Sequence, residues 1–336
     1  MRFMPKKSII WTTLFCCLFF VGTSLSVFAA QADTTYHHIL VISDFHYPTK
    51  SRTSFDAETK ARVIANKEKV IGDISKWKDV ELFALLGDYV ADGGSGSEYA
   101  AAKELMGRLQ KPFVAVAGNH EYSYVDNRDA KGKLAMASPE MRKAKYNQFK
   151  DMFGITGDVY QSRVVGKYLL IFLNPDVDTK QLVEMNQRQM DWLKAELAAH
   201  PNMPTIVFCH APLLGTLLNY EEDINEPKKV AQPVAAISEI LEQNPQVFMW
   251  VSGHTHTCPE TPSFNHPVNL YQGRVINIHN PSWEQETIWT NSLFLFPDKV
   301  VVRTFNHNEG RWVDSLDRVI QTSHIGKETR SLRPAM

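Results

Sequence analysis

The chain has 336 residues, and its 36 Lys and Arg against 37 Asp and Glu give a formal net charge of −1. This near-neutral balance excludes the basic excess that nucleic-acid-binding proteins usually carry. The length is sufficient for one large domain with a substantial core, or for a domain with an appendage.

The first 29 residues are typical of an export signal. Basic residues precede a mostly apolar run, residues 8–27, and small side chains follow at Ala29 and Ala30. We therefore expect residues 1–29 to be a signal peptide and the protein to be periplasmic or extracellular, with a net charge of −4 after cleavage. The alternative is an uncleaved anchor at the outer face of a membrane, because about 20 apolar residues span a bilayer. We expect contact with a membrane only if this N-terminal segment is not cleaved.

Apolar runs alternate with helical patterns in the next part of the chain. We predict strands at His38–Ser43, Val80–Leu86 and Phe113–Ala117, and helices at Phe55–Trp77 and Glu98–Leu109. This order is typical of a parallel sheet with right-handed crossovers.

A similar alternation returns further along. The predicted elements are a helix at Met141–Phe153, a hairpin of Val159–Val164 and Tyr168–Leu173, a helix at Asn186–Ala199, a strand at Thr205–Cys209, a helix at Val234–Gln243 and a strand at Phe248–Ser252. Two long polar stretches, Tyr122–Pro139 and Leu213–Pro233, predict surface loops that shape a binding site.

The last part of the chain contains short strand patterns without helices between them. They lie at Leu270–Ile278, Ser292–Phe296 and Val300–Phe305. This arrangement favours a second, partly antiparallel sheet packed on the first. We place the domain at residues 36–321 and a C-terminal tail at residues 322–336.

Five predicted strands end directly in residue types that bind metals. The segments are Ser43-Asp44-Phe45-His46, Gly87-Asp88, Gly118-Asn119-His120-Glu121, Cys209-His210 and Gly253-His254-Thr255-His256. In an open α/β sheet, ligands bind outside the carboxyl ends of the strands. A single histidine there is more often structural, but five such endings in one chain predict a metal centre.

This ordered set, which extends from Asp44 to His256, resembles the calcineurin-like metallophosphoesterase family. The resemblance implies an α/β fold, a four-layered α/β/β/α sandwich of two mixed sheets flanked by helices. It also implies a hydrolase that cleaves a small phosphorylated substrate, a phosphomonoester or a phosphodiester, through a metal-bridging hydroxide. The ligands it implies are Asp44, His46 and His256 for one metal ion, Asn119, His210 and His254 for the other, and Asp88 as the bridge between them.

The chemistry of these residue types agrees with that resemblance. Two divalent ions roughly 3.5–4 Å apart can lower the pKa of a shared water and bind the attacking and leaving oxygens of a displacement at phosphorus. Mixed His, Asp and Asn ligands suit Mn, Fe or Zn better than Mg or Ca, without choosing among the three.

Two residues that follow Asn119 are further candidates. We predict that His120 stabilises or protonates the leaving oxygen, because imidazole exchanges protons near neutral pH; the alternative is that it orients Asn119. Glu121 would orient a neighbouring histidine or would be a solvated loop carboxylate.

The cysteines outside the predicted signal each lie close to a predicted ligand. Cys209 precedes His210, and Cys258 lies two residues after His256. In an oxidising compartment they could form a disulfide that joins two ligand loops. The alternative is two unpaired thiols, because the sequence does not give the distance between their Cα atoms.

Some features depart from the family pattern or suggest other classes. Ala91 stands where many members have an acidic residue, and the purple acid phosphatase branch is disfavoured because it would have tyrosine there and glycine at His46. A zinc hydrolase of the metallo-β-lactamase type would need an acidic residue at Cys258. The main alternative is a catalytically silent module with the same fold, used for binding or scaffolding, but such a module would be expected to have lost ligands.

Overall fold

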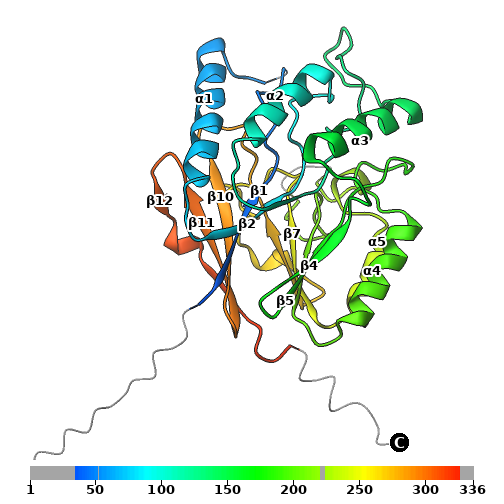
Figure 1. Ribbon diagram of the computed structural model, residues 1–336, viewed down its shortest axis with the longest axis vertical. Coiled ribbons are helices and arrows are strands. Elements are labelled where there is room, and N and C mark those ends of the chain that lie inside the picture. The colour runs from blue at the N-terminus through cyan, green and yellow to red at the C-terminus, as the bar shows by residue number, and fades with distance from the viewer. Residues whose placement is uncertain (1–34, 52, 220–223, 326–336) are drawn as a thin grey trace, which may run out of the picture. The chain divides into compact units, whose positions relative to one another are not determined.

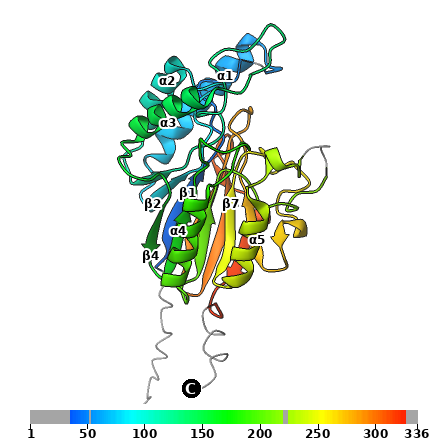
Figure 2. The same cartoon turned by 90° about the vertical axis from the view of Figure 1, so that its right-hand side faces the viewer.

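The computed structural model describes residues 35–51, 53–219 and 224–325, so the predicted export signal lies outside the described part of the chain. Two β-sheets face each other, and helices cover the outer face of each (Figures 1 and 2). Within the described residues, no helix combines the length and the apolar character needed to cross a bilayer.

The first sheet has seven strands in the order β12-β11-β10-β1-β2-β3, and β13 also pairs with β11. Strands β1 to β3 are parallel, whereas β10 to β13 are antiparallel to their partners. The bounds are β1 His37–Ile42, β2 Val80–Leu85, β3 Phe113–Ala115, β10 Trp289–Leu295, β11 Lys299–Asn306, β12 Arg311–Trp312 and β13 Arg318–Gln321.

The second sheet has six strands in the order β4-β5-β6-β7-β9-β8. Strands β5, β6, β7 and β9 are parallel, and β4 and β8 pair antiparallel at the two edges. The bounds are β4 Gln161–Val165, β5 Tyr168–Phe172, β6 Thr205–Phe208, β7 Val247–Ser252, β8 Leu270–Tyr271 and β9 Val275–His279.

The predicted assignment of the late strands was wrong in two respects. β10 and β11 do not form the second sheet; they extend the first, where β10 lies antiparallel to β1. The single strand predicted at Leu270–Ile278 is two strands, because Gln272 and Gly273 adopt left-handed backbone angles and turn the chain back on itself. Beyond β13 the ordered chain continues into Thr322, which is buried and bonds to the Tyr168 hydroxyl.

In the described part of the chain, five α-helices occupy the outer layers, three on the first sheet and two on the second. They are α1 Ala57–Ile74, α2 Gly96–Met106, α3 Pro139–Phe153, α4 Gln187–Ala199 and α5 Val234–Gln243, with short 3₁₀ turns η1 Pro227–Lys229, η2 Pro267–Asn269 and η3 Asp314–Leu316. Side-chain oxygens of Asp56, Ser95, Ser138 and Asn186 accept a backbone N–H in the first turn of α1 to α4.

Alternation along each strand sends its apolar side chains to two different cores. In β1, Leu40 and Ile42 pack against the helices, whereas Ile39 and Val41 pack against the second sheet. A third core lies between the second sheet and helices α4 and α5. The predicted four-layered α/β/β/α sandwich is therefore confirmed.

Candidate metal centre

The loops that follow β1, β2, β3, β6 and β7 bring the predicted ligands to one place. Four of them, Asp44, His46, Asp88 and His256, offer ligand atoms that lie within 4.8 Å of one another, and Asp88 also belongs to a second such group with His210 and His254. Asp88 is thus shared by two neighbouring groups, as a bridging ligand must be.

The distances in the first group are short. The Nε2 atoms of His46 and His256 lie 3.2 Å apart, and His256 Nε2 lies 3.2 Å from Asp44 Oδ1. Asp88 Oδ2 lies 3.7 Å from His46 Nε2.

The second group has the same spacing and includes Asn119. His210 Nε2 lies 3.2 Å from Asn119 Oδ1, 3.2 Å from His254 Nδ1 and 3.4 Å from Asp88 Oδ2. Asn119 Nδ2 donates to the Tyr124 hydroxyl at 3.1 Å, so the amide oxygen is the atom that faces the group.

Backbone carbonyls fix which histidine nitrogen faces each group. His46 Nδ1 donates to Val90 O at 3.3 Å, His210 Nδ1 to Leu86 O at 2.6 Å and His254 Nε2 to Lys228 O at 2.9 Å. In the neutral rings the opposite nitrogens therefore carry lone pairs. Because those of His210 and His254 face each other across 3.2 Å, they need a cation or a proton between them. This donor set fits a metal ion.

The ligands lie on unusual backbone. Asp44, His46, Asp88, His254 and His256 all have positive φ, between 46° and 66°, a conformation that costs non-glycine residues of order 1–3 kcal/mol each. Strain of this kind is found where a site dictates the direction of its side chains.

The glycines before the ligands allow the loops to approach closely. A Cβ on Gly118 would lie 2.2 Å from Asp88 Oδ1, and one on Gly253 would lie 2.2 Å from Asp44 Oδ2. Only glycine leaves room for both carboxylates.

Glu121 has a role that neither expectation described. It is fully buried, and its carboxylate accepts backbone N–H groups instead of orienting a histidine. Oε2 accepts from Asp88 and Gly118, both at 2.7 Å, and Oε1 accepts from Tyr89 at 2.7 Å and from Val90 at 3.3 Å. One side chain thus joins the loops that carry Asp88 and Asn119.

Burial and charge shift the pKa values of the site in different directions. Burial lowers the pKa of His120 to about 4 and that of His254 to about 3. At His210 burial opposes protonation, but the carboxylates of Asp88 and Asp44 raise the pKa to about 9. Metal binding at His210 would have to displace this proton.

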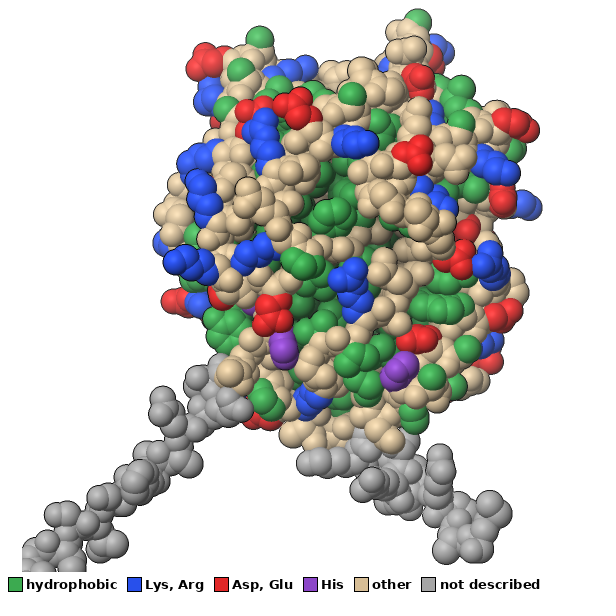
Figure 3. Space-filling model, in the orientation of Figure 1, with side chains coloured by type: hydrophobic (Ala, Val, Ile, Leu, Met, Phe, Trp, Pro, Cys, Tyr) green, Lys and Arg blue, Asp and Glu red, His purple; other side chains and the backbone are tan. Residues whose placement is uncertain are grey.

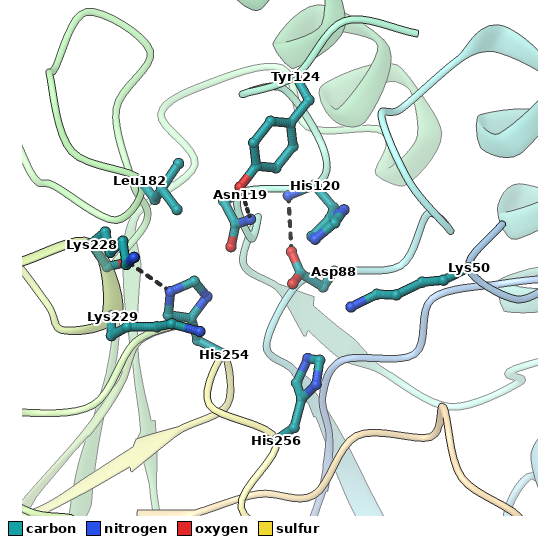
Figure 4. Close-up of a pocket in the computed structure, with 10 residues that line it drawn as sticks. All are labelled: Lys50, Asp88, Asn119, His120, Tyr124, Leu182, Lys228, Lys229, His254 and His256. Atoms are coloured by element: carbon teal, nitrogen blue, oxygen red, sulfur yellow. Dashed lines mark hydrogen bonds between the residues drawn. The ribbon is translucent and has the colours of Figure 1, made fainter. Parts of the chain in front are cut away.

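A cavity of about 290 Å³ opens over the ligands (Figure 4). His120 lines it, and since its Nδ1 bonds to the carbonyl of Asp92, Nε2 is the nitrogen available to a substrate. Tyr124 and Leu182 form other walls of the cavity, and Lys50, Lys228 and Lys229 add positive charge to it. These lysines could not be predicted from the sequence because they lie outside the motifs, Lys50 after β1 and the other two in η1.

A buried ion pair supports the loop after β1. Lys67 Nζ, in α1, donates to Glu284 Oε2 at 2.7 Å and to the carbonyls of His46 at 3.0 Å and Pro48 at 3.1 Å. The other Glu284 oxygen accepts from the Lys50 N–H at 3.0 Å. The pair therefore holds the backbone that presents both His46 and Lys50.

The proposed disulfide does not form. Cys209 is buried in the core between the second sheet and its helices, whereas Cys258 is half-buried and lies 3.4 Å from the Thr261 hydroxyl. Both thiols are free.

The four-layered sandwich and the His and Asp side chains clustered at its strand ends are the arrangement expected of a metallophosphoesterase. The model of the calcineurin-like phosphoesterase family matches residues 37–258, and the chain belongs to this family.

Individual relatives are distant. The chain is 20% identical over 225 residues to a probable glycerophosphodiester phosphodiesterase, GpdQ, from Arcobacter nitrofigilis, a match that covers 66% of this chain and 73% of that protein. A dimetal phosphatase from Danio rerio superposes with a TM-score of 0.56 at 13% identity, over 85% of this chain and 98% of that one. Purple acid phosphatase PPD1 from yellow lupin (Lupinus luteus) superposes with a TM-score of 0.57 at 13% identity, over 85% of this chain and 54% of that one. At such identities the structural likeness shows the fold.

Proposed function

We propose that this protein is an exported phosphoesterase that uses two divalent metal ions to hydrolyse a small phosphomonoester or phosphodiester by direct attack of water at phosphorus. The observation that supports it most is the convergence of seven ligands from five separate loops into two groups that share Asp88. A silent binding module would have no need to keep the complete set.

The ligands divide into two sets in this proposal. Asp44, His46 and His256 hold one ion, Asn119, His210 and His254 hold the other, and Asp88 binds both. When bound, the ions would lower the pKa of water and neutralise charge that develops on the phosphate. Mn, Fe and Zn all suit these ligands.

His120 is the candidate proton donor to the leaving oxygen. Its Nδ1 is held by the Asp92 carbonyl, so a proton would be transferred from Nε2. Because burial lowers the pKa of His120 to about 4, it can donate only if the bound substrate's negative charge raises that pKa.

The role of His120 can be tested by varying the leaving group. In His120→Asn we expect alkyl phosphates, whose alkoxide needs a proton, to lose about 100-fold or more in kcat, within the range for general acid catalysis. Activated aryl phosphates should lose much less. Equal losses on both would mean that His120 only orients Asn119.

The metal centre is tested by hydrolysis of an aryl phosphomonoester and the matching diester with Mn, Fe and Zn supplied separately. We expect Asp88→Asn to lose metal and turnover while keeping the fold. Asp79→Asn is the matched control, because Asp79 bonds to Tyr36 and His38 away from the site. Normal activity of Asp88→Asn, or fewer than about one ion per wild-type chain with every metal, would refute the proposal.

The export part of the proposal depends on the sequence pattern of residues 1–29. Expression of the full chain followed by cell fractionation and N-terminal sequencing tests it. We expect a mature protein beginning near residue 30 outside the cytoplasm; a cytoplasmic protein with an intact N-terminus would contradict export.

A further inference from the structure

Two lysines outside the metal-ligand pattern point into the cavity from opposite sides. Lys50 follows β1 and extends towards Asp88 and His256, whereas Lys229, in η1, extends past His254 (Figure 4). Their backbones are held in place: the Lys50 N–H donates to Glu284 Oε1 at 3.0 Å, and the Lys229 N–H donates to Glu226 O at 2.8 Å. Two separate elements therefore deliver positive charge to the same cavity.

Neither ammonium group forms a salt bridge with a carboxylate in the described ranges 35–51, 53–219 and 224–325. Other cations around the site do: Lys67 pairs with Glu284 at 2.7 Å, and Arg128 pairs with Asp92 at 2.5 Å. On the face shown in Figure 3, basic and acidic side chains are also interspersed. Lys50 and Lys229 are thus left to bind an anion that enters the cavity.

The scissile phosphate alone does not account for both lysines. In the proposed function its oxygens are met by the metal centre and by His120. Lys50 reaches in beside Asp88 and His256, whereas Lys229 reaches in from the opposite side beside His254 (Figure 4). A cavity of about 290 Å³ holds more than one phosphoryl group. A neutral or cationic substituent there would desolvate two ammonium groups without compensation.

We infer that the cavity selects phosphorylated substrates that carry a second phosphoryl group close to the scissile one, and that Lys50 and Lys229 bind this second group. This inference rests on the proposed function, because it assumes that the first group binds at the metal centre. Diesters with a cationic alcohol should be poor substrates for the same electrostatic reason.

The test compares methylphosphonate with methylenebisphosphonate, which adds one phosphonate to the same core. Binding to the metal-loaded protein is measured by calorimetry, and metal content is checked in every variant. We expect the wild type to prefer the bisphosphonate. Lys229→Met and Lys50→Met should each lower the ratio of the two affinities about tenfold, the loss of one hydrogen bond to a charged group. Chelation of the metals by the bisphosphonate is common to all variants and does not change this comparison.

Lys78→Met is the control, because it removes the same charge from an exposed position away from the cavity and should keep the ratio. A wild type without preference, or variants in which both ligands weaken equally, would overturn the inference. If the proposed function itself is wrong, the wild type will hydrolyse neither aryl ester. This result is independent of whether the protein binds the two phosphonates.

Discussion

Glu121→Gln is the substitution that most directly tests how the ligand loops are held together. The change keeps the size and shape of the side chain but replaces one carboxylate oxygen by an NH₂ group. Each oxygen accepts two backbone N–H groups in the protein, Oε2 from Asp88 and Gly118 and Oε1 from Tyr89 and Val90. In either orientation the amide nitrogen would face two donors.

The cost follows from the hydrogen bonds that the amide nitrogen cannot accept. Two hydrogen bonds to a charged group disappear, at about 1.5–3 kcal/mol each, and two buried N–H groups are left without an acceptor. We therefore expect the free energy of unfolding to fall by about 3 kcal/mol or more, a large part of the roughly 5–15 kcal/mol typical of a folded protein. Since Asp88 and Asn119 lie on the joined loops, metal content and kcat should fall as well.

Urea unfolding, metal analysis and turnover of an aryl phosphate measure these effects. Glu98→Gln is the matched control: its two oxygens accept one N–H each, from Asp92 and Ser95, and the side chain is half-buried. Only one hydrogen bond to a charged group is lost there and water can reach the side chain, so we expect a cost of about 1.5 kcal/mol or less and an unchanged metal content. Glu121→Gln protein with wild-type stability and metal content would refute the argument that this carboxylate joins the loops.

Other predictions concern packing, pH and metal removal. Gly118→Ala should lose metal and activity, because its Cβ would lie 2.2 Å from Asp88 Oδ1, whereas Gly157→Ala, with no atom within 4 Å, should retain both; a functional Gly118→Ala enzyme would contradict the close approach of the two loops. Burial lowers the pKa of His307 to about 3, so its stabilising contribution is present above pH 6.5 and is lost as the pH falls towards 3. Urea unfolding measures the fall in the free energy of unfolding between pH 6.5 and pH 5. This fall should be about 2 kcal/mol smaller in His307→Gln than in wild type. Equal falls in the two proteins would show that the pKa of His307 is not lowered. Removal of metal with a chelator should lower the melting temperature reversibly. The loss in the free energy of unfolding should be about 4 kcal/mol if the free metal had been at a thousand times its Kd. An unchanged melting temperature would argue that no metal ion had been bound.

The clustering of the candidate ligands could be predicted from the sequence because each of them follows a buried strand. Once Ile42, Leu85 and Phe208 are placed as strand ends, chain continuity puts Asp44, Asp88 and His210 at the carboxyl edges of the two sheets. The helices could be predicted equally well, since their apolar spacing and capping residues are local signals.

What the sequence could not provide is long-range pairing. Nothing local in β10 indicates that it lies beside β1 instead of in the second sheet. The same holds for Glu121, whose backbone donors Asp88, Tyr89 and Val90 lie 31 to 33 residues away along the chain. It holds too for Lys229, whose place in the cavity depends on the path of a long loop.

The left-handed backbone at five ligands has a consequence for engineering. Replacing one of them, for example Asp44 or His256, by glycine would release local strain of about 1–3 kcal/mol while removing a ligand. Laboratory evolution for heat resistance in a medium stripped of transition metals would therefore favour substitutions at these five positions. Screening the same libraries with metal supplied would reverse this selection, because an ion bound by these side chains would stabilise the folded protein by more than the strain costs.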